Sequence, residues 1–175
     1  MPVSSNRVVA SNGSQEGELI QSLIGSLGSD KGRVRQSARR SLVDLRQPAV
    51  PYLVSALKDP NTHRRWEAAK ALGQIGDPRA AGALVGALED RDVGVRWVAA
   101  DSLVKLGRGG LQPLLRALIT HPDSIWLREG AHRVLRHLAG SDLRQVLAPV
   151  LAALDDVEPT LGAPRAAYDA LDQLS

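Results

Sequence analysis

The sequence of 175 residues contains no cysteine and no phenylalanine, and it has only two tyrosines and three tryptophans. The absence of cysteine excludes disulfides, zinc–thiolate sites and thiol catalysis. No apolar run approaches the roughly 20 residues that a transmembrane helix needs, and residues 1–14 lack the continuous apolar stretch of a signal peptide. We therefore expect a cytoplasmic protein that makes no contact with a membrane.

The apolar residues that are present are mostly leucine, alanine and valine, and hydrophobic residues make up 43% of the chain. Leucine and alanine suit closely packed helices, whereas strands favour β-branched and aromatic residues. A chain of this length forms one domain that buries a real core. The composition thus predicts an all-α domain.

The charge changes sign along the chain, although the net charge is only +3. Lysine and arginine outnumber aspartate and glutamate by 11 to 6 in residues 1–70 and by 9 to 7 in residues 71–141, whereas residues 142–175 carry 2 against 6. The densest basic stretch, from Lys31 to Arg46, is typical of a solvated helix face. A site for an acidic partner or for nucleic acid is the alternative.

Four segments repeat one pattern, and they begin at Val34, Arg64, Val95 and Leu127. Each segment has an arginine in second place, then a small residue three positions later, a leucine after seven and an apolar residue after ten. These offsets lie on one face of a helix. The recurring residues are Arg35, Arg65, Arg96 and Arg128, then Ala38, Ala68, Ala99 and Ala131, and then Leu42, Leu72, Leu103 and Leu135.

A break containing glycine or proline follows each segment and leads to a second apolar stretch, and these stretches end at Leu57, Leu88, Leu118 and Leu154. The sequence therefore predicts four helical hairpins, flanked by a lone second helix at 19–27 and a closing first helix at 164–174. We expect a disordered tail at residues 1–15 and a single repeat domain at residues 16–175.

The recurring pattern Val-Arg-x-x-Ala-Ala-x-x-Leu, followed by Ala-Leu-x-Asp, resembles the HEAT repeat, and specifically its short variety, the PBS-lyase HEAT-like or E-Z repeat. The resemblance implies an α-solenoid, a right-handed superhelix with first helices on the convex side and second helices lining a concave groove. Members of the family include subunits of phycobilin lyases and scaffold proteins. The resemblance therefore implies binding to another protein.

The recurring arginines are expected to have a structural role. Asp59 and Asp90 stand six residues before Arg65 and Arg96. An aspartate just ahead of a helix can cap its free amides and pair with a nearby arginine. We therefore interpret these aspartates and the four arginines, Arg35, Arg65, Arg96 and Arg128, as contacts between repeats.

Two surfaces are candidates for binding a partner. Trp66 and Trp97 occupy the same repeat position, opposite the core face of adjacent first helices, and an exposed tryptophan pair is a candidate interaction site. The alternative is that Trp66 packs locally, with Lys70 in a cation–π contact. The second surface is the groove of the second helices, where we expect Tyr52, Ser55 and Arg116 to be exposed.

Enzymatic functions find little support in the sequence. The four histidines, His63, His121, His132 and His137, do not share a helix face at metal-ligand spacing, and no phosphate-binding loop or nucleophile motif occurs. We predict no catalytic residue, cofactor or metal, and a scaffold that binds another protein in preference to nucleic acid. The alternatives are a subunit of a bilin lyase or phycobiliprotein assembly factor, and a HEAT-like alkylpurine DNA glycosylase, for which Trp97 and Asp101 have the relevant residue types.

Overall fold

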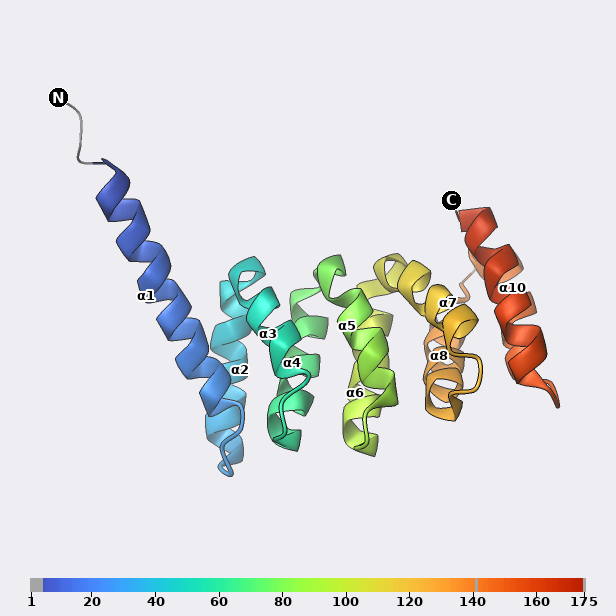
Figure 1. Ribbon diagram of the computed structural model, residues 1–175, viewed down its shortest axis with the longest axis horizontal. Coiled ribbons are helices and arrows are strands. Elements are labelled where there is room, and N and C mark those ends of the chain that lie inside the picture. The colour runs from blue at the N-terminus through green and yellow to red at the C-terminus, as the bar shows by residue number, and fades with distance from the viewer. Residues whose placement is uncertain (1–4, 141, 175) are drawn as a thin grey trace.

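The computed structural model describes residues 5–140 and 142–174, with side chains from Gln15 onward. Every regular element in these residues is helical, and no β-strand occurs among them. Figure 1 shows the helices standing side by side in an elongated array, with the two termini at opposite ends. The predicted all-α solenoid is therefore confirmed.

The array is built from helical hairpins. The first helices are α2 (Gly32–Leu45), α4 (Thr62–Ile75), α6 (Val93–Leu106) and α8 (Ile125–Leu138), and they pack against one another in a row. All four end where the sequence predicts and begin two residues earlier. The second helices are α3 (Val50–Ala56), α5 (Ala81–Gly86), α7 (Leu111–Thr120) and α9 (Arg144–Leu154).

Three of the first helices begin at a side-chain cap. Asn61, Asp92 and Ser124 each accept a hydrogen bond from the backbone N–H three residues later, which satisfies an otherwise unpaired amide of the first turn. Asp59 and Asp90, which we expected to be the caps, instead accept hydrogen bonds of 2.8 Å from the N–H groups of Asn61 and Asp92. The expected aspartates therefore hold the capping residues in place.

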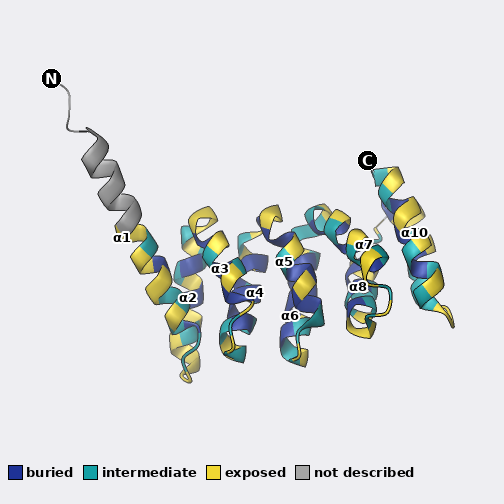
Figure 2. Ribbon diagram, in the orientation of Figure 1, coloured by how far each residue is buried: buried dark blue, intermediate teal, exposed yellow. Residues whose placement is uncertain are grey.

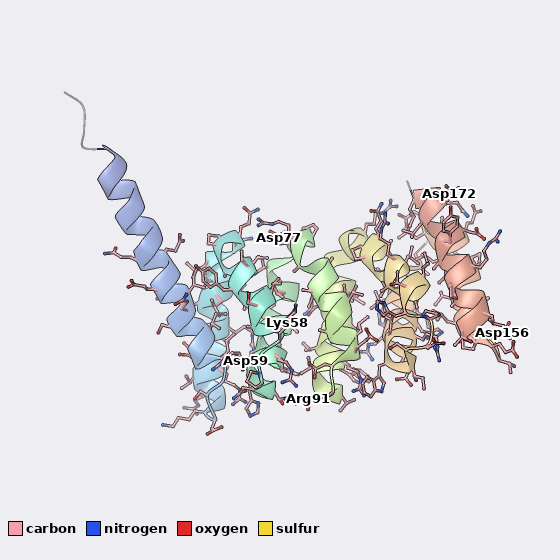
Figure 3. All side chains as sticks on the ribbon, in the orientation of Figure 1. Lys58, Asp59, Asp77, Arg91, Asp156 and Asp172 are labelled. Carbon is pink, nitrogen blue, oxygen red and sulfur yellow. The ribbon has the colours of Figure 1, made fainter. Side chains whose placement is uncertain are left out.

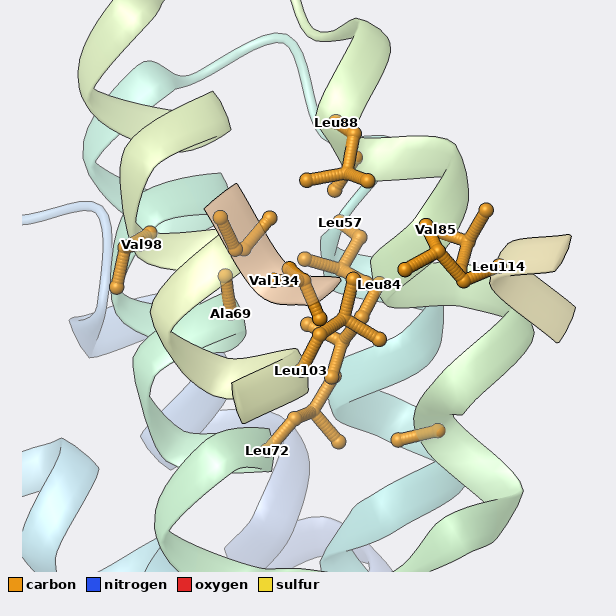
Figure 4. Close-up of a cluster of buried hydrophobic side chains, with 14 of the residues drawn as sticks. Leu57, Ala69, Leu72, Leu84, Val85, Leu88, Val98, Leu103, Leu114 and Val134 are labelled. Atoms are coloured by element: carbon orange, nitrogen blue, oxygen red, sulfur yellow. The ribbon is translucent and has the colours of Figure 1, made fainter. Parts of the chain in front are cut away.

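The core runs along the array as one continuous layer, and Figure 2 shows it as buried faces turned toward the inside of the hairpins. The small residues and leucines of the repeat lie in this layer, as predicted. Figure 4 shows Leu72 of α4, Leu103 of α6 and Leu84 of α5 converging in it. Burial of these side chains, at about 25 cal/mol per Å² of apolar surface, is the main force that holds neighbouring hairpins together.

The two ends of the array depart from the repeat. The first helix of the chain, α1 (Ser5–Ser26), packs against α2 and α3. Helix α1 overlaps the tail that we expected at residues 1–15, because the backbone is helical from Ser5. Residues 1–4 lie outside the described residues. The domain boundary at residue 16 therefore stays a prediction.

At the other end, α10 (Pro159–Leu174) packs against α7 and α9. We expected it to continue the row of first helices at α8, and that placement is wrong. Helix α9 packs against α8 and α10, and this leaves the position beside α7 to α10. The structure thereby closes the array with a helix in the second layer.

The turn after α2 contains a strained residue. Arg46 has φ 57° and ψ −125°, a region that residues with a side chain rarely adopt, whereas Gly107 occupies the equivalent place after α6 with φ 59° and ψ −131°. We expect Arg46→Gly to raise the free energy of unfolding by about 1 kcal/mol, because it relieves this strain. Urea denaturation followed by circular dichroism measures the change. Gly107→Ala is the reciprocal variant and should be destabilising, and a loss of stability in Arg46→Gly would contradict the interpretation.

Candidate functional site

The four repeat arginines bind the backbone of the loop before their own helix. In each case the Nη1 atom of the arginine donates a hydrogen bond to the backbone carbonyl oxygen six residues earlier. The pairs are Arg35 with Ser29 (2.7 Å), Arg65 with Asp59 (2.9 Å), Arg96 with Asp90 (2.9 Å), and Arg128 with Pro122. These carbonyls lie outside helices and would otherwise lack a partner in the protein. Figure 3 labels Asp59 and Arg91 in the loops at this edge of the array.

Arg65 also joins two repeats through Asp90, 25 residues later in the chain. Nε donates to one carboxylate oxygen at 2.7 Å and Nη2 to the other at 3.0 Å, and both side chains are buried. Burial alone would raise the pKa of Asp90, but the hydrogen bonds from Arg65 and from the Asp92 N–H, with the nearby positive charge, lower it below its usual value. The same pair raises the pKa of Arg65.

A second buried ion pair joins α2 to α4, and sequence reasoning missed it. Glu67 is 4% exposed, and its carboxylate accepts from Nη1 of Arg39 and lies 3.5 Å from Nε of Arg35. A glutamate on the core side of a helix that faces arginines 28 and 32 residues earlier is the signal that could have found it. The pair turns these basic side chains of α2 inward, away from any partner.

The predicted groove residues do not form one site. Tyr52 is half-buried against α1, since a Cβ added at Gly17 would lie 3.2 Å from its hydroxyl oxygen. Ser55 is exposed, and its hydroxyl donates to the carbonyl oxygen of Pro51 at 3.1 Å. Arg116 is exposed at the other end of the layer, where it lines a hollow with Tyr168 of α10.

The two tryptophans that the sequence paired, Trp66 and Trp97, differ in exposure. Trp66 is half-buried, and the Lys70 ammonium lies 4.5 Å from its ring centroid, which is the local packing that we considered as the alternative. The ring also lies against α6, 3.7 Å from a Cβ added at Gly94. By contrast, Trp97 is 55% exposed. Of the two, Trp97 is the one available to a partner.

Trp97 shares a pocket with Trp126, which the sequence analysis did not select. The pocket, of about 250 Å³, lies between α6 and α8 and is lined by Val93, Arg96, Trp97, Ala100, Trp126, Glu129, Gly130 and Arg133. The guanidinium carbon of Arg133 lies 3.6 Å from the Trp97 ring centroid, and that of Arg96 lies 4.6 Å from the Trp126 ring centroid. These cation–π contacts fix the orientation of both rings while Trp126 remains 46% exposed.

Charge is concentrated in the first-helix row. Helices α2, α4, α6 and α8 together contain twelve lysines and arginines against four aspartates and glutamates, whereas α3, α5 and α7 contain one arginine and no acid. The Trp97–Trp126 pocket therefore lies on the basic side of the molecule. Helices α3, α5 and α7 of the second layer are, by comparison, almost uncharged.

The alternatives raised by the sequence find no assembled site in the described residues. For the glycosylase alternative, the relevant residues are Trp97 and Asp101. Asp101 accepts a hydrogen bond of 3.1 Å from Arg133, and the guanidinium of Arg133 stacks on Trp97, so both residues are occupied by contacts with the same arginine. No group of three or more His, Asp or Glu side chains that could hold a metal ion occurs in the part of the chain that the structure describes. Among the same residues, no helix combines the length and the apolar character that crossing a bilayer would require.

Stacked hairpins of this kind define the class of helical-repeat solenoids. Residues 18–103, which run from α1 into α6, match the family model of HEAT repeats. Among solved structures it is similar to a chain of the complex of CpcE and CpcF of phycocyanin lyase from Nostoc sp. PCC7120. The TM-score is 0.60 and the identity 26%, over 88% of this chain and 98% of that chain.

A crystal structure of an engineered protein is also similar, with a TM-score of 0.45 and 20% identity over 87% of this chain and 77% of that one. The comparison with curated proteins gave no match.

Proposed function

We propose that this chain is a non-enzymatic scaffold that binds another protein, and that the Trp97–Trp126 pocket is the centre of its binding surface. The observation that carries the proposal is the pocket itself. Two half-exposed indole rings stand on adjacent helices of the first-helix row, and each is held by a stacked arginine. Tryptophan and arginine in such settings supply most of the binding energy of protein interfaces.

The surroundings of the pocket support the same function. Val93 lines the pocket and is exposed, and Ile125, which precedes Trp126 in the chain, is an exposed apolar residue as well. A large exposed apolar patch rimmed by polar side chains marks an interaction site in a soluble protein. The similar solved structure is a complex of two proteins, which supports a protein as the partner of this chain as well.

The double variant Trp97→Ala/Trp126→Ala tests this function. We expect the immobilised wild-type protein to retain its partner from an extract of the native source, and the double variant to retain at least about tenfold less, because the loss of two anchors exceeds 1.4 kcal/mol of binding energy. Quantitative mass spectrometry measures retention.

The matched control is Val157→Ala/Leu161→Ala, which removes two exposed apolar side chains, one just before α10 and one in its first turn. It should retain the partner as the wild type does, and circular dichroism verifies that both variants are folded. Equal retention by the wild type and a folded tryptophan double variant would refute the proposal.

A lyase-like role is the second candidate, and the similarity to a phycocyanin lyase chain over nearly all of that chain favours it. The same experiment separates the two. If the protein retained by the wild type and lost from the tryptophan double variant carries a bilin, the chain acts in that system. If the retained protein is colourless, the general scaffold stands.

A further inference from the structure

We propose that the Trp97–Trp126 pocket takes an acidic segment of the partner protein, with one large apolar side chain inserted between flanking carboxylates. This inference rests on the proposed function, because it specifies the chemistry of the partner for the same surface. It follows from the size of the pocket, from the charge of its walls and from the charge of the row of helices around it.

The size of the pocket fits one side chain. Its volume of about 250 Å³ is below the range of about 300–1,000 Å³ that is usual for small-molecule sites. Ala100 and Gly130 contribute no bulk to its lining, and the two indole rings and two guanidinium groups surround it. Gly130 has no room for a larger residue, since an added Cβ would lie 2.9 Å from a methyl carbon of Leu88. The shape therefore accepts one aromatic or large aliphatic side chain.

The charge of the walls favours carboxylates beside that side chain. Arg96 and Arg133 line the pocket and would repel a lysine or arginine of a partner, whereas Glu129 is the one carboxylate among the lining residues that the structure describes. Farther out, Lys105 of α6 and Arg136 of α8 are exposed on the same helices. An acidic segment is therefore electrostatically complementary to the pocket and to its surroundings.

A protein segment fits this surface better than nucleic acid does. A nucleic-acid backbone requires an unbroken basic track, but Arg35, Arg39 and Arg65 turn inward to Glu67 and Asp90. The exposed apolar side chain of Val93 in the pocket lining can contact a protein side chain favourably and offers no hydrogen bond to a phosphate.

Fluorescence anisotropy with a defined probe tests the inference. The probe is a labelled peptide with one phenylalanine flanked by three glutamates on each side. We expect it to bind the wild type at least about tenfold more tightly than the same peptide with alanine for phenylalanine, and than the peptide with lysine for glutamate. Binding should weaken as salt screens the charges, and Trp97→Ala/Trp126→Ala should abolish it.

Glu129→Gln provides a second variant that a folding defect cannot imitate. It removes the carboxylate from the lining, so the acidic peptide should bind this variant severalfold more tightly than the wild type. Unchanged or weaker binding to folded Glu129→Gln would overturn the assignment of an acidic segment. The peptide with lysine in place of glutamate should bind Glu129→Gln more weakly than it binds the wild type.

Three further outcomes would overturn the inference. If the acidic peptide fails to bind while the tryptophan double variant still loses its partner from the extract, the chemistry named here is wrong and the proposed function stands. If the wild type binds a twelve-nucleotide oligothymidylate more tightly than the acidic peptide, and the tryptophan double variant loses this binding, the pocket is assigned to nucleic acid. Self-association of the wild type by light scattering, absent from the variant, would assign it to a second copy of this chain.

Discussion

Replacing Arg65 with methionine is expected to lower the free energy of unfolding by about 3–5 kcal/mol, the cost of leaving one partner of a buried ion pair uncompensated. Methionine keeps the apolar stem but removes the donors to both Asp90 carboxylate oxygens and to the Asp59 and Pro60 carbonyls. Urea denaturation monitored by circular dichroism measures the loss. Adding Asp90→Asn should restore part of it, because the double variant no longer buries an unpaired charge.

The dependence on pH identifies the cause of that loss. In the wild type the pKa of Asp90 is lowered, so its contribution to stability is present above the unfolded value of about 3.9 and is lost as the pH falls through the lower folded value. In Arg65→Met burial dominates and should raise this pKa, so that the carboxylate destabilises the variant at neutral pH. The difference in stability between the two proteins should therefore narrow as the pH falls from 7 to about 3.

The control for Arg65 is an ion pair at the surface. Arg108 and Asp142 also form an ion pair between repeats, but both side chains are largely exposed. Arg108→Met should leave the urea midpoint nearly unchanged, because exposed pairs are screened by solvent. If Arg65→Met were as mild as Arg108→Met, the buried pair would not be a main contact between the repeats.

The substitution Gly73→Val should also be severe, with a loss of about 3 kcal/mol from overpacking. At this position α4 and α6 approach so closely that an added Cβ would lie 2.8 Å from the Cα of Ser102 and 2.4 Å from its hydroxyl oxygen. That hydroxyl donates across the same contact to the carbonyl oxygen of Ala69 at 2.9 Å. Valine must therefore push the two helices apart, and a lower urea midpoint measures the effect.

Gly82→Val is the matched control for Gly73→Val. Gly82 lies in α5, is exposed, and has no atom within 4 Å of an added Cβ. Because valine forms helix slightly better than glycine, this change should alter stability by less than about 0.5 kcal/mol. Equal losses in the two variants would show that the backbone preference of glycine matters more than the close approach of α4 and α6.

The helices could be predicted from the sequence because their signals are local. The spacing of Ala38 and Leu42, repeated three times, locates the buried face of each first helix, and the following glycine or proline fixes its end. The capping residues were harder to assign, since Asp59 and Asn61 both have side chains that accept a backbone N–H. Their roles differ because α4 begins at Thr62, directly after Asn61, and the residue at which a helix begins is known only from the structure.

The candidate site was predicted only in part because its contacts are distant in the sequence. Trp97 was selected from its repeat position, but Trp126 stands outside that register and reaches the same pocket from the start of α8. The placement of α10 was missed for a similar reason. The segment that connects α8 to α9 was visible in the sequence, but the direction in which it takes α9 depends on packing against α8 and α10.

The buried contacts between repeats are unevenly distributed along the array. From α2 to α6, the repeats are joined by Glu67, by the pair of Arg65 and Asp90, and by the Ser102 hydroxyl. Beyond α6, the ion pairs between repeats involve exposed or half-exposed side chains, such as Arg133 with Asp101. In a linear array, local stiffness follows the strength of the contacts between neighbouring units. The N-terminal half should therefore move as one stiff body and the C-terminal half as a compliant one. The pocket lies at the border between the two halves, so a small rotation of α8 relative to α6 would change the distance between the two indole rings and with it the shape of the proposed binding surface.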